Sequence, residues 1–503
     1  MSHPQLLVLA PLAVEARALR THDPRVVVER CGAGSRRAAA TLRRLGPITD
    51  AAAVAVMGVA GGLDPRVAAG DLVVADRVVG PDGTTLRRLP SAALLSAALA
   101  AAGLQVHTGP VVTTPRVVHG AAERRELAAA SGALVVDIES ATLVAADWQR
   151  PLAVIRAVAD TAGRELFSPR IVRDGVRALA ALRRAVPVVA GWATTAGPRR
   201  VLLASPRASC AGVERAVRTV ERALELRGAP VYVRRQIVHN RHVVADLEAR
   251  GAVFVEELEA VPDGATVVFS AHGVSPTVRS EAGARALSII DATCPLVAKV
   301  HSEVRRFAAK GYQVVLVGHR EHDEVEGTVG EADNIAVITS AGEVAGLAPA
   351  DPTRVAYATQ TTLATDETRS VIEALTARFP SVVGPHAADI CYATQNRQDA
   401  VRAIAAEVDL VLVVGSTNSS NTTRLAEVAR RCGTRAEVLD DAGHLDLSWL
   451  AGAGTVGLTA GASAPEHLVR SVIEALRGLG PLDVEERAVT TETVAFPLPV
   501  EVR

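Results

Sequence analysis

The second half of the chain repeats one arrangement, in which a short apolar run leads into a polar loop and then into an amphipathic segment. It occurs at residues 267–275, 313–324, 410–421 and 455–466. Apolar runs of this length predict buried strands, and strands that alternate with helices predict parallel sheets. Ligands bind at the carboxyl ends of such strands, where hydroxyls and free helix amides suit phosphate oxygens. The pattern therefore predicts an α/β fold whose loops converge on one anion.

The first 190 residues show the same alternation. Short strands are predicted at Leu6–Leu9, Ala53–Met57, Asp71–Val74, Leu134–Val136 and Leu152–Ile155. Between residues 191 and 200, small and turn-forming residues replace the periodic pattern, which predicts a linker. We therefore expect two α/β parts, residues 1–190 and 201–503.

Composition narrows the class of protein. The 503 residues carry a formal net charge of −1 and only 3% aromatic residues, whereas a nucleic-acid surface needs basic clusters and stacking aromatics. No apolar run reaches membrane-spanning length, and the first residues lack a basic targeting segment. We expect a cytoplasmic protein with neither nucleic acid nor a membrane span.

Five scattered cysteines are typical of a reducing compartment rather than of a disulfide framework. Cys210, Cys294 and Cys391 are separated by 84 and 97 residues. Three thiolates from distant segments could hold an iron–sulfur cluster that leaves one iron without a protein ligand. A zinc site and unrelated buried thiols are the alternatives. Cys31 and Cys432 are predicted to be ordinary buried thiols.

Polar side chains recur in the loops of the second half. They are His239, His272, His322, Thr361, Ser419, Ser420, Asn421 and Ser463. Any one of them alone is typical of a helix cap, a turn or the surface. Their recurrence beside three separated cysteines predicts a metal-dependent α/β enzyme that acts on a phosphorylated small molecule.

An ordered series of motifs runs through residues 201–497. The motifs are SCAGVERAV (209–217), IVHNRHVV (237–244), SAHGVS (270–275), DATCPLVAKVH (291–301), HDEVEGT (322–328), QTTL (360–363), ICYATQNRQ (390–398), NSSN (418–421) and TAGASAPE (459–466). This series resembles the 4-hydroxy-3-methylbut-2-enyl diphosphate reductase (LytB/IspH) family. The resemblance implies a three-lobed α/β fold around one 4Fe-4S cluster per chain, with Cys210, Cys294 and Cys391 as its ligands.

The resemblance also implies roles for the polar residues. The substrate diphosphate would be bound by His239, His272, Ser419, Ser420, Asn421 and Ser463. His322, Glu324 and Thr361 would surround the allylic hydroxyl, with Glu324 supplying the proton that lets it leave as water. The products would be isopentenyl and dimethylallyl diphosphate, and a ferredoxin- or flavodoxin-type protein would donate the electrons.

Two departures from the family pattern lie near these residues. Ala208 and Ser209 stand where the family has glycine and an aromatic residue, and Glu321 stands where it has glycine. Loss of glycine restricts the backbone, and Glu321 adds negative charge near an anionic substrate. An altered rate or substrate preference is therefore conceivable. The alternative function is a metal-containing regulatory protein that senses isoprenoid diphosphate or redox state, for which Glu324 would be unnecessary.

The first part of the chain carries five motifs of its own. They are APLAVEARAL (10–19), GVAGGLD (58–64), GDLVVAD (70–76), VDIESAT (136–142) and IRAVAD (155–160). With them, residues 4–190 resemble the nucleoside phosphorylase and methylthioadenosine/S-adenosylhomocysteine nucleosidase family, and more particularly the phosphorylase-like proteins associated with hopanoid synthesis. The resemblance implies a purine nucleoside ligand, with Glu139 on the ribose hydroxyls, Asp160 on the departing purine and Glu15 activating water.

Whether water or phosphate attacks the nucleoside is left open by these motifs. Arg17, Arg36 or Arg37 could bind phosphate, although arginines on predicted helices are more often solvated. A nucleoside-binding domain without catalysis is the alternative.

Overall fold

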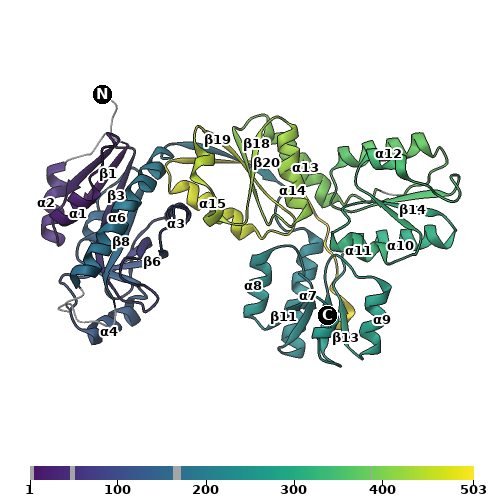
Figure 1. The fold of residues 1–503 in the computed structure, drawn as a ribbon, viewed down its shortest axis with the longest axis horizontal. Coiled ribbons are helices and arrows are strands. Elements are labelled where there is room, and N and C mark those ends of the chain that lie inside the picture. Colours follow the sequence, from purple (N-terminus) through teal and green to yellow (C-terminus); the bar gives the residue numbers. More distant parts are fainter. Residues whose placement is uncertain (1–4, 46–50, 162–170, 387) are drawn as a thin grey trace. The chain divides into compact units, whose positions relative to one another are not determined.

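The computed structural model describes residues 5–45, 51–161, 171–386 and 388–503 (Figure 1). They form two compact units. The first comprises Met1–Val201, Asp441–Gly454 and Arg470–Val484, and the second comprises Leu202–Asp440, Thr455–Val469 and Glu485–Arg503. Two late segments of the chain therefore belong to the first unit. The observed units are discontinuous in sequence, whereas a boundary at residues 191–200 alone would give two continuous units.

The segment predicted as a linker is largely regular structure. Helix α6 (Ile171–Thr194) continues into it, and strand β9 (Arg199–Ser205) begins before its end. The helix continues because its last turns are anchored in the core, where Trp192 is fully buried and Ala193 is nearly so. Small residues here pack closely in a helix, and residues 195–198 alone separate the end of α6 from the start of β9.

The first unit is an α/β domain built on one eight-stranded sheet. Its remaining elements are β1 (Leu6–Ala10), α1 (Ala13–Leu19), β2 (Val26–Arg30), α2 (Ser35–Leu45), β3 (Ala53–Gly62), β4 (Leu72–Val79), β5 (Thr85–Arg88), α3 (Ala92–Ala101), β6 (Val106–Thr113), α4 (Ala121–Ser131), β7 (Val135–Asp137), α5 (Ser140–Val144) and β8 (Leu152–Asp160). Each of the five predicted strands overlaps one of these strands.

Five strands of this sheet pair in a closed circuit. β3 pairs with β8, β8 with β4, β4 with β6, β6 with β7, and β7 again with β3. Strands β3 and β8 are buried along most of their length, as strands covered on both faces are. The carboxyl end of β8 and the start of α5 therefore lie close to the same central strand, β3.

The second unit contains three separate sheets, with strand orders β11-β10-β12-β13, β15-β14-β16 and β18-β17-β19-β9-β20. Its strands are β10 (Val231–Arg234), β11 (Ala252–Val255), β12 (Thr266–Phe269), β13 (Ser288–Asp291), β14 (Gln313–Val317), β15 (Ile335–Ile338), β16 (Val355–Thr359), β17 (Leu410–Val414), β18 (Arg435–Leu439), β19 (Thr455–Ala460) and β20 (Leu482–Ala488). The three sheets confirm the expected three α/β lobes.

Helices connect these strands. They are α7 (Ala211–Arg227), α8 (Arg241–Ala249), α9 (Pro276–Ala284), α10 (Pro295–Ala309), α11 (Asp323–Val329), α12 (Thr365–Arg378), α13 (Tyr392–Ala405) and α14 (Ser420–Arg431), with short 3-10 turns η1 (Leu258–Ala260), η2 (Ala341–Gly346) and η5 (Val500–Val502). The turns η3 (Ala442–His444) and η4 (Leu447–Leu450) and most of helix α15 (Glu466–Arg477) belong to the first unit. In the described part of the chain, no helix combines the length and apolar character needed to cross a membrane.

The strands within each lobe run parallel: β10 to β13, β14 to β16, and β17 to β19. Carboxyl ends of parallel strands share one edge of a sheet, so the polar loops that follow them gather there.

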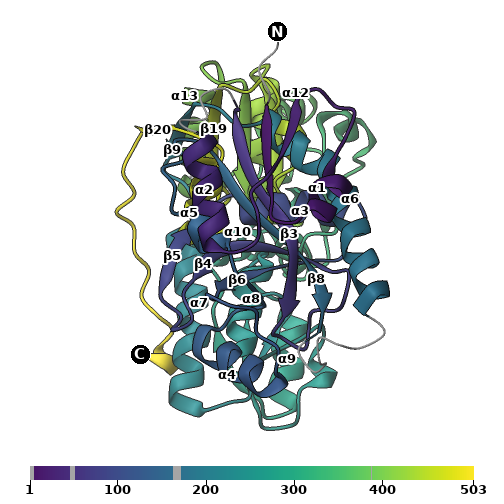
Figure 2. The same ribbon diagram turned by 90° about the vertical axis from the view of Figure 1, so that its left-hand side faces the viewer.

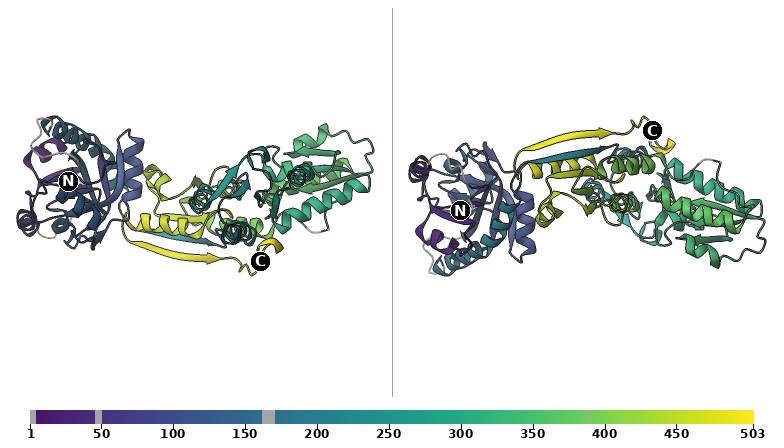
Figure 3. Two further views of the ribbon diagram at one scale, coloured as in Figure 1. Left: turned by 90° about the horizontal axis from the view of Figure 1, so that it is seen from below. Right: turned by 90° about the horizontal axis from the view of Figure 1, so that it is seen from above.

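The last residues of the chain run back to the first lobe of the second unit (Figures 2 and 3). Strand β20 lies at the edge of its sheet beside β9, and an extended segment then leads to η5. There Val502 is fully buried in the core of the lobe built on strands β10 to β13. Arg215 on α7 donates a hydrogen bond to the Pro497 carbonyl at 2.8 Å. The C-terminal segment thus ties two lobes together.

The cysteines outside the motif series differ in burial. Cys31 is buried, as predicted, whereas Cys432 is exposed, so its predicted burial is wrong. Cys432 caps the C-terminal end of α14 directly after Arg430 and Arg431, and this turn faces solvent.

Candidate functional site

Three helix N-termini in the second unit each carry a cysteine at the cap position. Cys210 caps α7, Cys294 caps α10 and Cys391 caps α13. The Cys391 sulfur accepts a hydrogen bond from the Thr394 amide at 3.3 Å and lies 3.0 Å from Thr394 Oγ1. Free amides and the positive end of a helix dipole favour an anionic sulfur. All three thiols line one pocket, and each is therefore placed to act as a thiolate ligand.

The same pocket requires glycine at position 212. A Cβ atom there would lie 2.7 Å from the Cys294 sulfur and 3.9 Å from the Cys210 sulfur. Burial raises the pKa of Cys294 to about 12, and burial followed by the charge of Cys210 raises the pKa of Cys391 to about 11. Positive charge from metal ions is what allows such a group of thiols to ionise together.

The spacing of the thiols bears on the kind of metal. Among the described residues, one group of three ligand side chains has all its donor atoms within 4.8 Å of one another, and it contains no cysteine. The three sulfurs are thus spaced more widely than the ligands of one zinc ion, which favours a multi-iron cluster over the zinc alternative.

A buried carboxyl group lies in the same pocket. Glu324, in the first turn of α11, is only 2% exposed. Its Oε1 accepts a hydrogen bond from the Thr361 amide at 2.7 Å, and its Oε2 accepts one from the Thr361 hydroxyl at 2.9 Å. Burial raises the pKa of Glu324 to about 7, although both bonds from Thr361 oppose the rise. A carboxyl group with this pKa is suited to donate a proton near neutral pH.

Three imidazoles form one cluster beside Glu324. The rings of His239 and His272 stack with centroids 4.1 Å apart, and His322 meets them edge-on at 5.2 and 5.6 Å. His322 caps α11, where its Nδ1 accepts from the Glu324 amide at 3.1 Å. Burial, and then the charge of His239, lowers the pKa of His322 to about 4, so its Nε2 carries the proton of a neutral ring.

Hydroxyl and amide groups from the lobe that contains β17 and β19 complete the lining of this pocket. Ser463 donates to the His239 carbonyl at 3.0 Å and lies 3.2 Å from the hydroxyl of Ser419, the N-cap of α14. Asn421 accepts from the Ala462 amide at 2.9 Å, which joins the loops after β17 and β19. Donors on neighbouring loops and a helix N-terminus are suited to phosphate oxygens.

The structure brings all twelve predicted residues of this half into the one pocket. It also adds groups that the sequence did not single out. Thr362 lines the pocket and donates to Ser420 at 2.9 Å, and Asp323 lies beside His239 and His272. Thr362 directly follows the predicted Thr361, and Asp323 lies between the predicted His322 and Glu324, so their positions were the available signal.

One buried arginine holds the cysteine loops in place. Arg397 on α13 is fully buried and donates to the Ala208 carbonyl at 3.0 and 2.8 Å. Its Nη1 also pairs with Glu492 of the C-terminal segment at 2.9 Å. Because Ala208 lies two residues before Cys210 and Arg397 six residues after Cys391, this guanidinium links two of the three cysteine segments.

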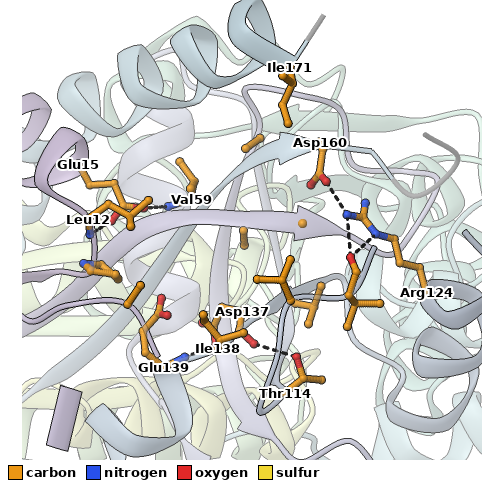
Figure 4. A pocket seen from close by; sticks show the side chains of 18 residues that line it. Leu12, Glu15, Val59, Thr114, Arg124, Asp137, Ile138, Glu139, Asp160 and Ile171 are labelled. Carbon is orange, nitrogen blue, oxygen red and sulfur yellow. Dashed lines mark hydrogen bonds and ion pairs between the residues drawn. The ribbon is translucent and has the colours of Figure 1, made fainter. Parts of the chain in front are cut away.

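A second site lies in the first unit, in a cavity of about 340 Å³ (Figure 4). Four carboxylates line it: Glu15 from α1, Asp137 at the end of β7, Glu139 at the start of α5, and Asp160 at the end of β8. Glu15 is held by backbone amides, with Oε2 accepting from Leu12 at 2.6 Å and Oε1 from Val59 at 2.7 Å. Burial raises the pKa of Glu15 above its usual range. The structure thus brings the three predicted residues together in a cavity of small-molecule size.

A buried arginine, not identified from the sequence, organises two acids. Arg156 on β8 is fully buried and pairs with Asp137 at 2.7 Å and with Glu139 at 3.0 Å. Burial raises the pKa of Glu139 to about 7, although Arg156 opposes the rise. A Cβ at Gly58 would lie 2.6 Å from Arg156 and 2.9 Å from Glu15, so the glycine loop makes room for this network.

Asp160 has a fixed partner as well. Arg124 on α4 donates to Asp160 Oδ2 at 2.5 Å and to the Val118 carbonyl at 3.2 and 3.3 Å. An ion-paired carboxylate accepts hydrogen bonds, so in this arrangement Asp160 can bind an N–H group of a base. Arg17, Arg36 and Arg37 are exposed, and the residues that line the cavity do not include them.

Comparisons with known proteins match the two parts of the chain to two different families. The family model described as LytB protein matches residues 201–477, more than half of the chain. The 4-hydroxy-3-methylbut-2-enyl diphosphate reductase of Bordetella pertussis is 57% identical over 306 residues, which cover 61% of this chain and 94% of that protein. The same-named protein of Acidithiobacillus ferrooxidans is 55% identical over 302 residues, covering 60% and 96%. The chain belongs to the LytB family.

A solved structure resembles the LytB half. The E-1-hydroxy-2-methyl-but-2-enyl-4-diphosphate reductase from Plasmodium falciparum is 36% identical, covers 61% of this chain and 97% of that one, and gives a TM-score of 0.59. The first part of this LytB protein matches the family model described as Phosphorylase superfamily over residues 15–187. A 5'-methylthioadenosine/S-adenosylhomocysteine nucleosidase from Helicobacter pylori covers 38% of this chain at 15% identity with a TM-score of 0.33, a likeness too low to assign an activity.

The departures from the LytB pattern now have structural explanations. Ala208 has a φ of 58°, in the left-handed region where glycine is favoured, which accounts for the family's glycine. Ser209 donates to the Ala464 carbonyl at 3.3 Å. Glu321 is exposed, and the described residues that line the pocket do not include it, so the expected charge near the substrate does not enter the pocket.

Proposed function

We propose that the second unit is a 4-hydroxy-3-methylbut-2-enyl diphosphate reductase, which removes the allylic hydroxyl and yields isopentenyl and dimethylallyl diphosphate. Relatives with this name match it at 55–57% identity over nearly their whole length. The single observation that carries the proposal is the buried Glu324, bonded through both oxygens to Thr361 in a pocket that three helix-capping cysteines also line. A sensor that only binds the diphosphate has no need of a proton donor with a pKa near neutrality.

The cofactor proposed for Cys210, Cys294 and Cys391 is one 4Fe-4S cluster per chain. The fit rests on donor chemistry, since three thiols at three helix N-termini suit an anionic cluster with one iron free of protein ligands. When bound, such a cluster supplies electrons one at a time and a Lewis-acidic iron for the substrate oxygen. A ferredoxin- or flavodoxin-type protein is the proposed electron donor.

The protein's own groups do the remaining work. His239, His272 and the loop of Ser419, Ser420 and Asn421, with Ser463, bind the diphosphate and so orient the hydroxyl toward Glu324. Glu324 gives up its proton so that the hydroxyl leaves as water instead of as hydroxide. Thr361 holds both oxygens of the conjugate base after transfer. The burial of Glu324 limits competing protonation from solvent.

An anaerobic assay tests this proposal. The full-length protein, reconstituted with iron and sulfide, is mixed with the hydroxylated diphosphate and a chemical reductant, and both products are quantified. We expect turnover, and we expect Cys391→Ala to lose the cluster spectrum and activity together. A fully loaded protein that binds the diphosphate and forms neither product would refute the reductase and favour the sensor.

We also propose that the first unit binds a purine nucleoside and cleaves its N-glycosidic bond. The Phosphorylase superfamily match ends at residue 187 and the LytB match begins at 201, which supports assigning this activity to residues 1–190. Glu139 binds the ribose hydroxyls, Asp160 protonates or hydrogen-bonds the departing purine, and Glu15 takes the proton of an attacking water. The cavity supports this because all three carboxylates face it and two are fixed by arginines.

Release of adenine from full-length protein tests the second proposal. The panel comprises adenosines with small and with large apolar 5' substituents, because apolar side chains predominate in the cavity lining. Each is incubated with and without phosphate, which separates hydrolysis from phosphorolysis. Glu139→Gln should abolish release while reductase turnover is retained. Binding of a nucleoside without release under either condition would support a non-catalytic domain instead.

A further inference from the structure

Gln360 is a buried side-chain amide that stands next to the pocket residue Thr361 in the sequence. It directly follows β16 and is 1% exposed. Gly318, which follows β14, leaves room for it, because a Cβ atom there would lie 3.2 Å from Gln360 Cβ and 3.3 Å from Gln360 Oε1. Both the oxygen and the nitrogen of a buried amide need hydrogen-bond partners, so its partners fix which way the group faces.

The hydrogen bonds of Gln360 have a single possible direction. The backbone amide of His319 can only donate, and it lies 3.1 Å from Gln360 Oε1, which identifies that atom as the acceptor. The other end is therefore the NH2 group, which donates to Thr362 Oγ1 at 3.0 Å. Because Thr362 accepts this bond, its own hydroxyl hydrogen is left for another acceptor. Among the described residues that acceptor is Ser420 Oγ, at 2.9 Å.

The same chain of bonds decides where the hydroxyl hydrogen of Ser420 points. Ser420 Oγ already receives the hydrogen of Thr362, and a hydroxyl group has only one hydrogen of its own to donate. Ser420 begins α14 and lines the pocket, so that hydrogen is free to point into the pocket. A hydroxyl that accepts one hydrogen bond also donates a stronger one. Ser420 is thus oriented as a donor for an anionic oxygen.

We propose that Gln360 is a positioning residue, which acts through Thr362 to turn the hydroxyl hydrogen of Ser420 toward a diphosphate oxygen. This rests on the proposed reductase function only in that Ser420 meets a diphosphate. Gln360 and Thr362 follow β16, whereas Ser420 follows β17 in another lobe. The described residues that line the pocket do not include Gln360, so it acts on the ligand without touching it.

Replacement of Gln360 by Glu reverses this chain of bonds with almost no change of shape. At about pH 9, well above the usual pKa of a carboxyl group, the introduced side chain can only accept. The hydrogen of Thr362 then turns toward the carboxylate, and the hydrogen of Ser420 turns toward Thr362 and away from the ligand. A hydrogen bond to a charged group is worth about 10- to 100-fold in affinity, so diphosphate binding should weaken by that factor.

Titration calorimetry measures the affinity on the full chain with its cluster, under anaerobic conditions. The ligand is isopentenyl diphosphate, which carries the diphosphate but has no hydroxyl to remove. Thr362→Val breaks the chain of bonds without adding charge and should weaken binding about fivefold, the worth of one neutral hydrogen bond. Gln313→Glu makes the same exchange as Gln360→Glu at the first residue of β14, outside the pocket lining, and should bind as the wild type does.

A Ser420→Ala background separates the chain of bonds from simple repulsion by the new carboxylate. Gln360→Glu should weaken binding no further in that background, whereas repulsion would weaken it equally in both. An equal loss in both backgrounds would overturn the proposal. Wild-type affinity in Gln360→Glu and Thr362→Val would do the same, as would a wild-type protein that does not bind the diphosphate.

Two further readouts keep the conclusions apart. Iron per chain shows whether each variant has folded around its cluster. Wild-type protein that binds isopentenyl diphosphate but does not turn over the hydroxylated diphosphate would count against the reductase, and the affinities of the variants would still decide the role of Gln360.

Discussion

Replacement of Glu324 by Gln tests the proton-donor role most directly, because the exchange is nearly isosteric. The Gln carbonyl oxygen can accept from the Thr361 amide, and its amide nitrogen can donate to the Thr361 hydroxyl, so the two observed bonds have substitutes. The variant should fold and hold its cluster. What it lacks is an acidic proton in the pocket.

The size of the effect follows from the role. A positioned general acid contributes about 10²- to 10⁴-fold in rate, which is roughly 3–5 kcal/mol of barrier. Burial raises the pKa of Glu324 to about 7, so the acid is protonated below that pH and loses its proton above it. Wild-type turnover should therefore decline as pH rises through about 7. The residual rate of Glu324→Gln should lack this decline.

Steady-state kinetics under anaerobic conditions, over a range of pH, measure both effects. The expected result is a kcat lowered at least about 100-fold with little change in diphosphate affinity or in iron per chain. A loss below tenfold at full cluster occupancy would refute the proton-donor role. A pH profile that keeps its high-pH decline in the variant would assign that decline to another group.

Further predictions concern residues around both sites. Thr361→Val removes a hydrogen bond that lowers the pKa of Glu324, so the high-pH decline in turnover should move to higher pH. Ala208→Gly relieves the left-handed backbone, worth about 1–2 kcal/mol, less the cost of added chain entropy, so the urea midpoint measured by circular dichroism should rise slightly. Arg397→Met leaves Glu492 without its buried partner, a change that costs about 3–5 kcal/mol, and iron per chain should fall. Asp160→Asn should abolish adenine release, measured by chromatography, without changing reductase turnover.

The sequence could predict that these polar side chains meet in one pocket, because loops that follow parallel strands lie at the same edge of a sheet. His272, Thr361 and Ser463 each follow a parallel strand within a few residues, and the carboxyl ends of such strands share an edge. The spacing of the cysteines alone did not identify their metal, because a zinc site remained an alternative. The family resemblance, and then the three helix caps, favoured the cluster.

Residues that act through distant partners could not be predicted in this way. Arg397 lies within a recognised motif, but its acceptor on Ala208 is 189 residues away in sequence. Asp323 belongs to the site because it lies beside His239 and His272, which come from another lobe. The continuation of α6 to Thr194 likewise depends on the pocket that receives Trp192, because composition alone cannot distinguish a small-residue helix surface from a linker.

The acidity of Glu324 shows how tertiary structure sets the chemistry of a residue that a motif only locates. Burial by itself would push the pKa of this carboxyl group higher and make it a weaker acid. Two hydrogen bonds from Thr361, which is 37 residues away and on a different loop, oppose that rise and hold the pKa to about 7. A general acid is most effective when its pKa lies near the working pH. The motif supplies the carboxyl group of Glu324, and the contact between α11 and the loop after β16 sets its pKa. Thr361 therefore acts on the reaction through Glu324 even where it does not touch the substrate.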